Sequence, residues 1–284
     1  MKKNKAKEKV ICFFNTAKVW GGGEKWHFEH ALALKERGYS PIAVTAKNSD
    51  LAYRFKQANI PVYELEIGIL SFLNIFKQKK IAEIFKQNSV STVIINLSAD
   101  LKIAAIVAKR VGVPRIIYRR GSAIPIKSNP LNKFLLQKTV THILANSEET
   151  KRTVLEYIKL KPDKIRVIYN GIKLENYTFN VEQIKPFTIG VLGRLNKQKA
   201  LHYFIDLVGD LRVTGLNFKA LIGGKGELEE QLKAYTQEQK LDNYIEFAGF
   251  QTDINAFMQR IDVFVLTSKW EGFGYVLAEA AACG

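Results

Sequence analysis

Two glutamates near the end of the chain, Glu271 and Glu279, are the side chains whose types and spacing most clearly suggest chemistry. Gly272 and Gly274 interrupt regular structure between them, so we expect Glu271 in a loop and Glu279 in the first turns of the following helix. An ionised carboxylate is a pure hydrogen-bond acceptor, and two of them so placed can hold the hydroxyl groups of a sugar or a ribose. The alternative is that the two glutamates are unrelated and solvated, because the spacing alone does not distinguish the two cases.

Two glycine-containing loops follow predicted strands near the start of predicted helices. In the first, Arg194 and Lys199 follow Gly193 and suit a diphosphate, because arginine offers a planar fork of donors and lysine a point charge. This loop could instead be a surface loop with two solvated cations. The second, Gly223-Gly224-Lys225-Gly226, repeats the strand–glycine–helix pattern at the same sheet edge, unless it is only a flexible turn.

A third glycine loop, Gly21-Gly22-Gly23-Glu24, follows the first predicted strand and opens the first predicted helix. Glycines there let a ligand approach the backbone, and a helix N-terminus attracts anions. The loop is not a dinucleotide fingerprint, because Trp26 stands where the third glycine would be, and the chain has no P-loop pattern. A tight turn that needs glycine for positive φ is the alternative.

Apolar runs rich in β-branched residues alternate with longer helical patterns along the chain. We expect strands at residues 10–15, 41–46, 62–65, 92–96, 115–119, 142–145 and 165–168, and helices at 24–37, 51–58, 70–87, 101–111, 133–139 and 148–157. After a polar stretch the alternation restarts, with strands at 188–193, 218–222, 245–248 and 263–266 and helices at 201–211, 227–239, 254–259 and from about Tyr275 onward.

This alternation predicts an α/β protein of two Rossmann-like domains, residues 1–182 and 183–284, each with a parallel sheet covered by helices. Ligands of such sheets bind at the carboxyl ends of the strands, close to helix N-termini. The cleft between the two domains is therefore the expected site.

The net charge of +16 belongs to the first part of the chain. Residues 1–184 hold 32 lysines and arginines against 15 aspartates and glutamates, a balance of +17, whereas residues 185–284 hold 11 against 12, a balance of −1. A basic surface of this size favours anionic partners such as an acidic lipid surface or a phosphorylated substrate, unless it is only a solvated face.

Composition excludes several other classes of protein. Two cysteines, Cys12 and Cys283, cannot build a disulfide framework or a zinc cluster, which favours a reducing cytoplasm. No apolar run reaches the length of a membrane span. We find no Asp-x-Asp pair, and His27 and His30 share a helix face that suits packing better than metal ligation, so no metal is expected. No nucleic-acid-binding motif accompanies the basic charge, so no nucleic-acid partner is expected.

Taken in order, the motifs resemble glycosyltransferase family 4 along the whole chain. Its nucleotide-binding signature is similar to Asp262-Val-Phe-Val-Leu-Thr-Ser268, Glu271-Gly-Phe-Gly and Glu279-Ala-Ala-Ala-Cys-Gly284. The three glycine loops, Asn146-Ser147 and Asn170-Gly171 resemble further family markers. The resemblance implies the GT-B fold, with two Rossmann-like domains whose parallel sheets face a cleft.

The resemblance also implies an activity and a role for each site residue. The protein would be a retaining hexosyl-type transferase that moves a sugar from a nucleotide-diphosphate sugar to a glycan or lipid-linked acceptor in surface polysaccharide or lipopolysaccharide synthesis, without cofactor or metal. Glu271 would contact the transferred sugar, Glu279 would hold the ribose, and Arg194 with Lys199 would neutralise the diphosphate. The other expected donor-binding positions are Gly22, Gly23, Gly224, Gly272, Phe273 and Gly274.

The sequence departs from the family pattern at several positions. Arg119-Arg120-Gly121-Ser122 stands in a loop where members often carry a histidine; the arginines would either bind an acidic or phosphorylated acceptor or be solvated. Lys173 and Ala200 replace a common aspartate and a common glycine.

The family pattern continues beyond Gly284 with further strand–helix units. We therefore expect a fragment whose second domain is incomplete, with an exposed sheet edge. A non-catalytic truncated chain with at most weak nucleotide binding is the alternative. We expect a cytoplasmic protein whose basic first domain suits peripheral contact with the inner face of an anionic cell membrane.

Overall fold

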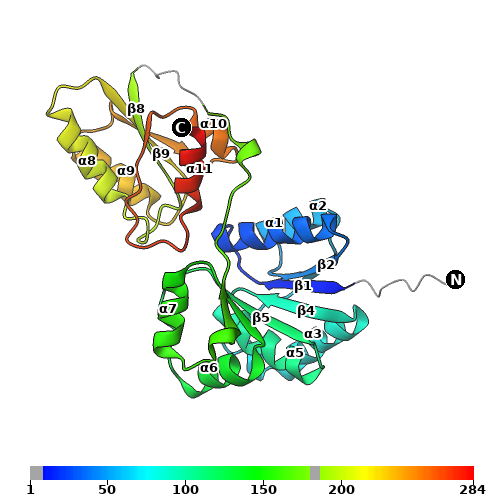
Figure 1. Ribbon diagram of the computed structural model, residues 1–284. Coiled ribbons are helices and arrows are strands. Elements are labelled where there is room, and N and C mark those ends of the chain that lie inside the picture. The colour runs from blue at the N-terminus through cyan, green and yellow to red at the C-terminus, as the bar shows by residue number, and fades with distance from the viewer. Residues whose placement is uncertain (1–8, 180–185) are drawn as a thin grey trace. The chain divides into compact units, whose positions relative to one another are not determined.

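The computed structural model describes residues 9–179 and 186–284 (Figure 1). It divides into two compact units, the first ending at Asn170 and the second beginning at Gly171. This division falls within the Asn-Gly pair that the sequence marks as a family feature. The domain boundary expected between residues 182 and 183 lies outside the described residues.

The first unit is built on a seven-stranded parallel sheet of order β3-β2-β1-β4-β5-β6-β7. Its strands are β1 (Val10–Asn15), β2 (Ser40–Thr45), β3 (Val62–Glu64), β4 (Val90–Ile95), β5 (Arg115–Arg120), β6 (His142–Ala145) and β7 (Ile165–Val167). Its helices are α1 (Gly22–Glu36), α2 (Asp50–Gln57), α3 (Ile75–Gln87), α4 (Ser98–Asp100), α5 (Ile106–Arg110), α6 (Pro130–Phe134) and α7 (Glu148–Tyr157), with π-helical turns at Leu101–Ala105 and Leu135–Thr139.

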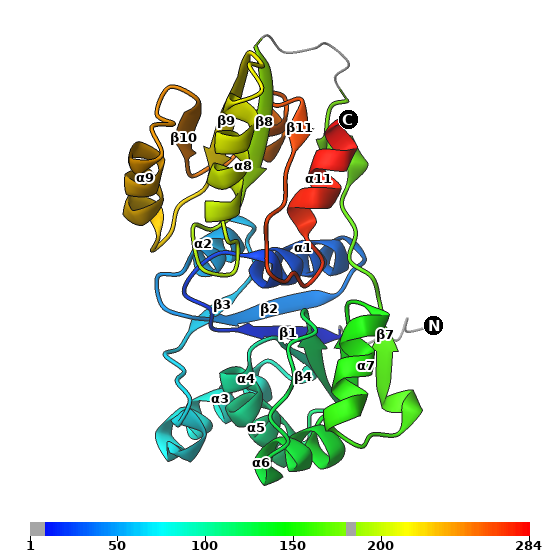
Figure 2. The same cartoon turned by 90° about the vertical axis from the view of Figure 1, so that its left-hand side faces the viewer.

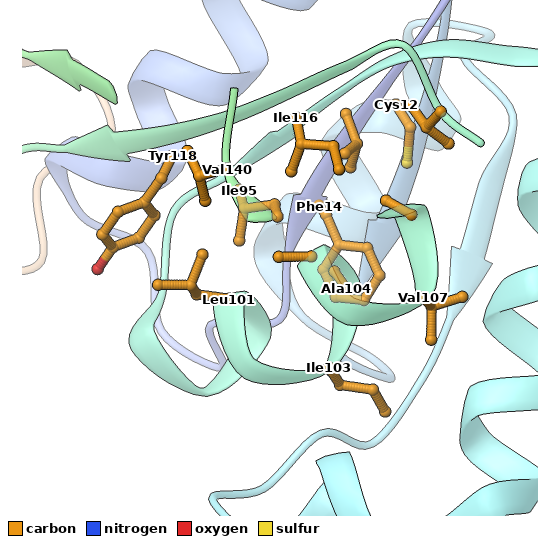
Figure 3. Close-up of a cluster of buried hydrophobic side chains, with 14 of the residues drawn as sticks. Cys12, Phe14, Ile95, Leu101, Ile103, Ala104, Val107, Ile116, Tyr118 and Val140 are labelled. Carbon is orange, nitrogen blue, oxygen red and sulfur yellow. The ribbon is translucent and has the colours of Figure 1, made fainter. Parts of the chain in front are cut away.

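Successive residues of β1 point to opposite faces of the sheet, and each face has its own apolar core. Ile11 and Phe13 pack with residues of α1 and α2. Cys12 and Phe14 pack on the other face with residues of α3, α5 and the two π-helical turns, as Figure 3 shows in part. Because both faces are covered, the strands are nearly continuous apolar runs, the pattern expected of a parallel sheet.

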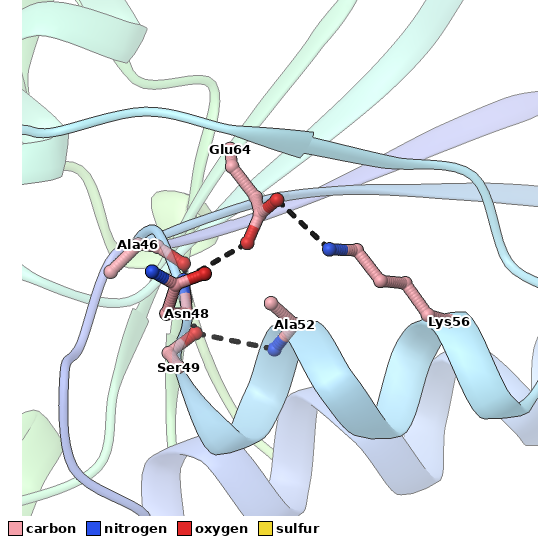
Figure 4. A network of polar contacts seen from close by, with 6 residues as sticks. All are labelled: Ala46, Asn48, Ser49, Ala52, Lys56 and Glu64. Carbon is pink, nitrogen blue, oxygen red and sulfur yellow. Dashed lines mark hydrogen bonds and ion pairs between the residues drawn. The ribbon is translucent and has the colours of Figure 1, made fainter.

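The loop after β2 is held by a small polar network (Figure 4). The Ser49 hydroxyl caps α2 by accepting from the Ala52 amide at 3.2 Å and donates to the Ala46 carbonyl at 3.0 Å. Glu64 accepts from the Asn48 amide at 3.0 Å and from Lys56 Nζ at 2.9 Å. These bonds lower the pKa of the Glu64 carboxyl and tie the carboxyl ends of β2 and β3 to α2.

The second unit is built on a four-stranded parallel sheet of order β10-β9-β8-β11 (Figure 2). Its strands are β8 (Phe187–Leu192), β9 (Phe218–Gly223), β10 (Ile245–Gly249) and β11 (Val263–Phe264), and its helices are α8 (His202–Arg212), α9 (Glu229–Glu238), α10 (Ile254–Met258) and α11 (Tyr275–Cys283). Two apolar clusters cover its faces, one centred on α8 and α9 and one on α10 and α11. β11 lies at one edge of this sheet, and Val263 on it is 45% exposed.

The α/β class and the two parallel sheets confirm the prediction, and the strands and helices follow in the expected order. The helix expected at residues 70–87 differs, because α3 begins only at Ile75. The Asn74 side chain accepts from the Lys77 amide and caps the helix there, and a separate 3₁₀ turn, Ser71–Leu73, precedes it. In the described ranges, no helix combines the length and apolar character needed to cross a bilayer.

Candidate functional site

Two loops cross at the carboxyl ends of β8 and β9 in the second unit. The Gly193 amide donates to the Gly223 carbonyl at 3.0 Å, and the Leu195 amide donates to the Lys225 carbonyl at 3.1 Å. The loop that follows β8 is therefore bonded to the loop that follows β9 just beyond the sheet. Both lie where a parallel sheet presents its ligand-binding edge.

Glycine is required where these loops cross. Gly224 has φ +130°, and a Cβ built on it would lie 1.8 Å from the Gly193 carbonyl oxygen. A Cβ on Gly226 would lie 2.3 Å from the Leu195 carbonyl oxygen. Gly224 and Gly226, which the sequence marked as a second glycine loop, thus permit a backbone approach that no side chain allows.

The loop after β8 is also bonded to the segment after β11. The Thr267 hydroxyl donates to the Lys199 carbonyl at 2.8 Å, and the Lys269 amide donates to the Gln198 carbonyl at 2.9 Å. The Gln198 side chain in turn donates to the Trp270 carbonyl at 2.9 Å. These three bonds place the loop with the predicted cation beside the loop with the predicted carboxylate.

Lys199 and Glu271, two of the predicted site residues, form an ion pair. Lys199 Nζ lies 2.6 Å from Glu271 Oε1, and the two side chains are 16% and 24% exposed. The lysine stem passes over Gly193, where a Cβ would lie 2.9 Å from Lys199 Cε. The pair therefore has a fixed position, partly shielded from water, at the carboxyl edge of the sheet.

Two neighbours of the pair complete this loop. Arg194 is exposed, one residue after Gly193. Ala200, which stands where the family commonly has glycine, is buried and has φ +48°. The position thus has a left-handed backbone that disfavours any residue with a Cβ, which explains the common glycine and shows that alanine is held there under local strain.

Glu279 lies in α11, as predicted, and is 4% exposed. Its Oε1 accepts from the hydroxyl of Tyr177 at 3.1 Å. Gly274 precedes the helix with φ +73°, a conformation that glycine adopts without strain. Gly272 and Phe273 lie half-buried between Glu271 and this helix, so the structure gathers the predicted carboxylates and their intervening glycines in one segment.

The glycine loop of the first unit lies at the N-terminus of α1, as predicted. Gly22 and Gly23 are its first two helical residues, and Gly21 supplies no side-chain cap. A Cβ on Gly23 would lie 2.6 Å from Asn96 Nδ2 at the end of β4, so the close approach of Asn96 requires glycine here. Gly22 and Gly23 belong to a different compact unit from Lys199 and Glu271.

Arg119 is 4% exposed, so the solvated alternative is wrong for this side chain. Its Nη1 donates to Asn96 Oδ1 at 3.0 Å, and its guanidinium carbon lies 4.7 Å from the centre of the Trp26 ring. Arg120 is half-buried and donates to the carbonyls of Ser122 and Ile124. Sequence reasoning could place the two arginines at the end of β5 but could not separate the buried one from its neighbour.

Three buried polar side chains beside the glycine loop, Asn15, Thr16 and Asp100, were missed from the sequence. Asn15 donates to Glu24 Oε1 at 3.0 Å, while Asp100 accepts from the Thr16 amide at 2.9 Å and from its hydroxyl at 2.5 Å. These bonds hold the chain at both ends of the loop that leads from β1 to α1. Asp100 is the one acid between Glu83 and Glu148 and stands at the start of a helical pattern, and this isolated acid is the signal that could have identified it.

Comparison with known proteins gives two family matches that together cover residues 20–284. The family described as Glycosyltransferase Family 4 matches residues 20–176, which is more than half of the chain, and the one described as Glycosyl transferases group 1 matches residues 176–284. The chain belongs to glycosyltransferase family 4. The resemblance inferred from the sequence motifs is thereby confirmed.

Curated relatives of this family 4 chain are distant in sequence. It is 26% identical over 257 residues to the N-acetylgalactosamine-N,N'-diacetylbacillosaminyl-diphospho-undecaprenol 4-alpha-N-acetylgalactosaminyltransferase of Campylobacter jejuni, covering 83% of this chain and 68% of that protein. It is 28% identical over 201 residues to the UDP-Gal:alpha-D-GlcNAc-diphosphoundecaprenol alpha-1,3-galactosyltransferase of Escherichia coli, covering 63% and 52%. It is 26% identical over 161 residues to the putative glycosyltransferase EpsF of Bacillus subtilis, and this match covers 53% of this chain and 42% of that protein. The chain thus spans between 42% and 68% of the length of these three relatives.

Solved structures confirm the GT-B fold. The Anabaena protein Alr3699/HepE in complex with UDP-glucose has a TM-score of 0.82 at 21% identity, covering 96% of this chain and 78% of that one. A glycosyltransferase from Rickettsia africae has a TM-score of 0.80 at 22% identity, covering 97% and 77%.

Asp100 makes the stability of this family 4 chain depend on pH. Burial raises the pKa of its carboxyl from 3.8 to about 7, against the opposing effect of the two bonds from Thr16. The folded state therefore keeps a proton that the unfolded state releases, and the free energy of unfolding should fall as pH rises from about 4 to about 7, by up to about 1.4 kcal/mol per pH unit. Urea unfolding of both proteins over this range measures the effect: the free energy of unfolding of the wild type minus that of Asp100→Asn should fall as pH rises. The exposed Asp163→Asn variant is the control, and parallel profiles for Asp100→Asn and wild type would contradict the prediction.

The two histidines of α1 make packing contacts with aromatic side chains. His27 is fully buried with its ring 5.5 Å from that of Phe13, and burial together with the charge of Arg119 lowers its pKa well below the usual range. His30 stacks on Trp26 with ring centres 3.8 Å apart. Among the residues that the structure describes, no group of three or more histidine, cysteine, aspartate or glutamate side chains could hold a metal ion. That the family 4 reaction here needs no metal stays a prediction.

Proposed function

We propose that this chain carries the catalytic centre of a retaining glycosyltransferase. It would move a hexose-type sugar from a nucleotide-diphosphate sugar to a glycan or lipid-linked acceptor in the synthesis of a surface polysaccharide or lipopolysaccharide. The observation that carries this proposal is the Lys199–Glu271 ion pair. It lies at the carboxyl edge of the second sheet, where the glycine loops that follow β8 and β9 approach each other closely.

The chemistry of these residues supports a nucleotide-diphosphate donor. When the bond between the anomeric carbon and the diphosphate oxygen breaks, negative charge grows on the diphosphate, and the ammonium of Lys199 with the guanidinium of Arg194 would stabilise that leaving group. Glu271 would accept hydrogen bonds from sugar hydroxyls, and Glu279, steadied by Tyr177, from the ribose. Complexes of the similarly folded Alr3699/HepE with UDP and with UDP-glucose support a uridine nucleotide as the first donor to test.

Two observations support the proposed acceptor: the names of two relatives and the two arginines at the end of β5 in the first unit. Two of the relatives named above carry diphospho-undecaprenol acceptors in their names. Arg119 and Arg120 lie at the carboxyl end of β5, and Arg119 is fixed by Asn96 and Trp26. A rigid guanidinium at a sheet edge suits an acidic or phosphorylated group, so we assign these arginines to the acceptor side.

A ligand-binding experiment tests the donor half of the proposal. UDP-, GDP- and ADP-sugars are added in turn to the full-length protein, and thermal unfolding is followed. We expect one of them to stabilise the wild type by about 2.7 kcal/mol at a concentration of about 100 Kd. The same ligand should give a much smaller shift with Lys199→Met.

Lys197→Met is the matched control, because Lys197 is an exposed lysine of the same loop. It should respond to the ligand as the wild type does. Equal shifts in all three proteins would contradict the assignment of Lys199 to the diphosphate. A nucleotide shift without transfer to any glycan or lipid-linked acceptor would favour the alternative of a non-catalytic chain.

A further inference from the structure

The segment that joins β3 to α3 exposes a dense group of large apolar side chains. Five of the eight residues from 69 to 76 are between 64% and 82% exposed: Ile69, Leu70, Leu73, Ile75 and Phe76. Elsewhere in the first unit, exposed large apolar residues of the described chain are singles or pairs. We call these five side chains the 69–76 surface; exposed apolar side chains that gather on a protein surface mark an interaction site.

The segment that carries the 69–76 surface is held in shape by hydrogen bonds between its own polar groups. The Gly68 amide donates to Ser71 Oγ at 2.8 Å, and Asn74 Oδ1 accepts from the Lys77 amide at 2.9 Å. Lys77 Nζ donates to Ser71 Oγ at 3.2 Å and to the Glu66 carbonyl. The fold thus satisfies the polar atoms within the segment and leaves the apolar side chains on the outside.

Positive charge lies one helical turn away. Ile81, Ile84 and Phe85 bury the inner face of α3, while the outer face carries Lys79 and Lys80, four residues after Ile75 and Phe76. Residues four apart are neighbours on a helix surface, so Ile75 and Phe76 each have an exposed lysine next to them. Apolar side chains beside lysines complement a bilayer that combines acyl chains with anionic head groups.

The 69–76 surface lies at the same edge of the first sheet as the residues assigned to the acceptor. It follows the carboxyl end of β3, and the carboxyl ends of parallel strands meet at the same edge of a sheet. Gly22 and Gly23 follow β1 of that sheet, and Arg119 and Arg120 are the last two residues of β5. An acceptor carried in a membrane would therefore have its head group on the same side of the first unit as these residues.

We propose that the 69–76 surface docks the first unit on an anionic lipid bilayer. Ile75 and Phe76 enter the boundary between head groups and acyl chains, and Lys79 and Lys80 meet the lipid phosphates. This surface would bring the enzyme to a lipid-linked acceptor, a role that rests on the proposed function. The lipid contact itself needs neither donor nor acceptor.

The experiment is cosedimentation of the full-length protein with vesicles of phosphatidylcholine alone or of phosphatidylcholine mixed with phosphatidylglycerol. The wild type should bind the mixed vesicles. Ile75→Ser/Phe76→Ser should weaken binding more than about tenfold, and Lys79→Gln/Lys80→Gln about tenfold or more, since each charge near the surface contributes about a factor of five. Thermal unfolding should be unchanged, because all four side chains are exposed.

Two double variants make the matched controls. Val213→Ser/Leu216→Ser removes two apolar side chains of the second unit that are 80% and 58% exposed. Lys159→Gln/Lys161→Gln removes the same charge from exposed lysines elsewhere in the first unit. Both should bind mixed vesicles within about twofold of wild type: Val213 and Leu216 lie outside the proposed contact, and the charge of Lys159 and Lys161, far from it, is largely screened.

Three results would overturn the proposal: wild-type binding that does not need phosphatidylglycerol, variants and controls that weaken binding equally, or a wild type that self-associates through Phe76 and ignores vesicles. Failure of the proposed function is separate, because it appears as loss of the nucleotide-sugar shift. Ile75→Ser/Phe76→Ser should keep that shift in full.

Discussion

Replacing Lys199 with methionine is expected to lower kcat for sugar transfer by about 100- to 1,000-fold, the usual cost of removing a fixed charge that stabilises a leaving group. Methionine keeps most of the stem that passes over Gly193 and removes the ammonium, which lies 2.6 Å from Glu271 Oε1. The loss should appear in kcat as well as in kcat/KM, because the diphosphate carries more charge in the transition state than in the bound donor.

The controls separate a charge effect from a structural one. Lys197→Met removes a charge from an exposed position in the same loop and should leave kcat near wild type. Adding Glu271→Gln to Lys199→Met should cost less than the two separate losses multiplied together, because the two side chains form one pair. A Lys199→Met protein with nearly wild-type kcat, measured at saturating donor, would show that the pair is only structural.

Replacing Gly224 with alanine is expected to destabilise the second unit by about 3 kcal/mol or more. Two separate costs combine: the backbone has φ +130°, and the new Cβ would lie 1.8 Å from the Gly193 carbonyl oxygen. That oxygen belongs to a backbone that is itself bonded to Gly223, so it cannot move aside without breaking the loop crossing. Nucleotide-sugar binding should be lost with it.

Gly215→Ala separates these two costs. Gly215 also has positive φ, +75°, but a Cβ there has no heavy atom within 4 Å, so we expect a loss of only about 1 kcal/mol. Urea unfolding followed by circular dichroism measures both variants against wild type. Equal losses would mean that backbone conformation alone matters and that the crossing adjusts to a side chain.

The fold could be predicted from the sequence because its strands are short apolar runs and its helices are periodic, each pattern repeated many times. The one marked difference, the start of α3, has a local cause. Residues 70–76 continue the apolar pattern of the helix, but Asn74 caps the helix, and Leu70 and Leu73 before it are exposed. Periodicity cannot distinguish an apolar residue that is buried from one that the fold leaves exposed.

The second-unit part of the candidate site was predictable because its residues follow strand ends. Lys199 and Glu271 were assigned to one edge by topology, and the structure places them in contact. Their direct pairing was not predicted, since the sequence gives no distance between two loops. Asp100 and Tyr177 were missed for a similar reason: each acts through a partner distant in the chain, Thr16 and Glu279 respectively.

The ion pair between Lys199 and Glu271 would also set a threshold on ligand charge. The ammonium already has a carboxylate 2.6 Å away, so an anion that approaches it must displace or share that counter-ion. A singly charged group would offer the lysine little more than it has. Under the proposed function, a diphosphate would bring enough charge to displace the carboxylate, and Glu271 would then be free to bind the sugar attached to it. The pair would thus favour doubly charged anions before any part of the sugar or base is bound.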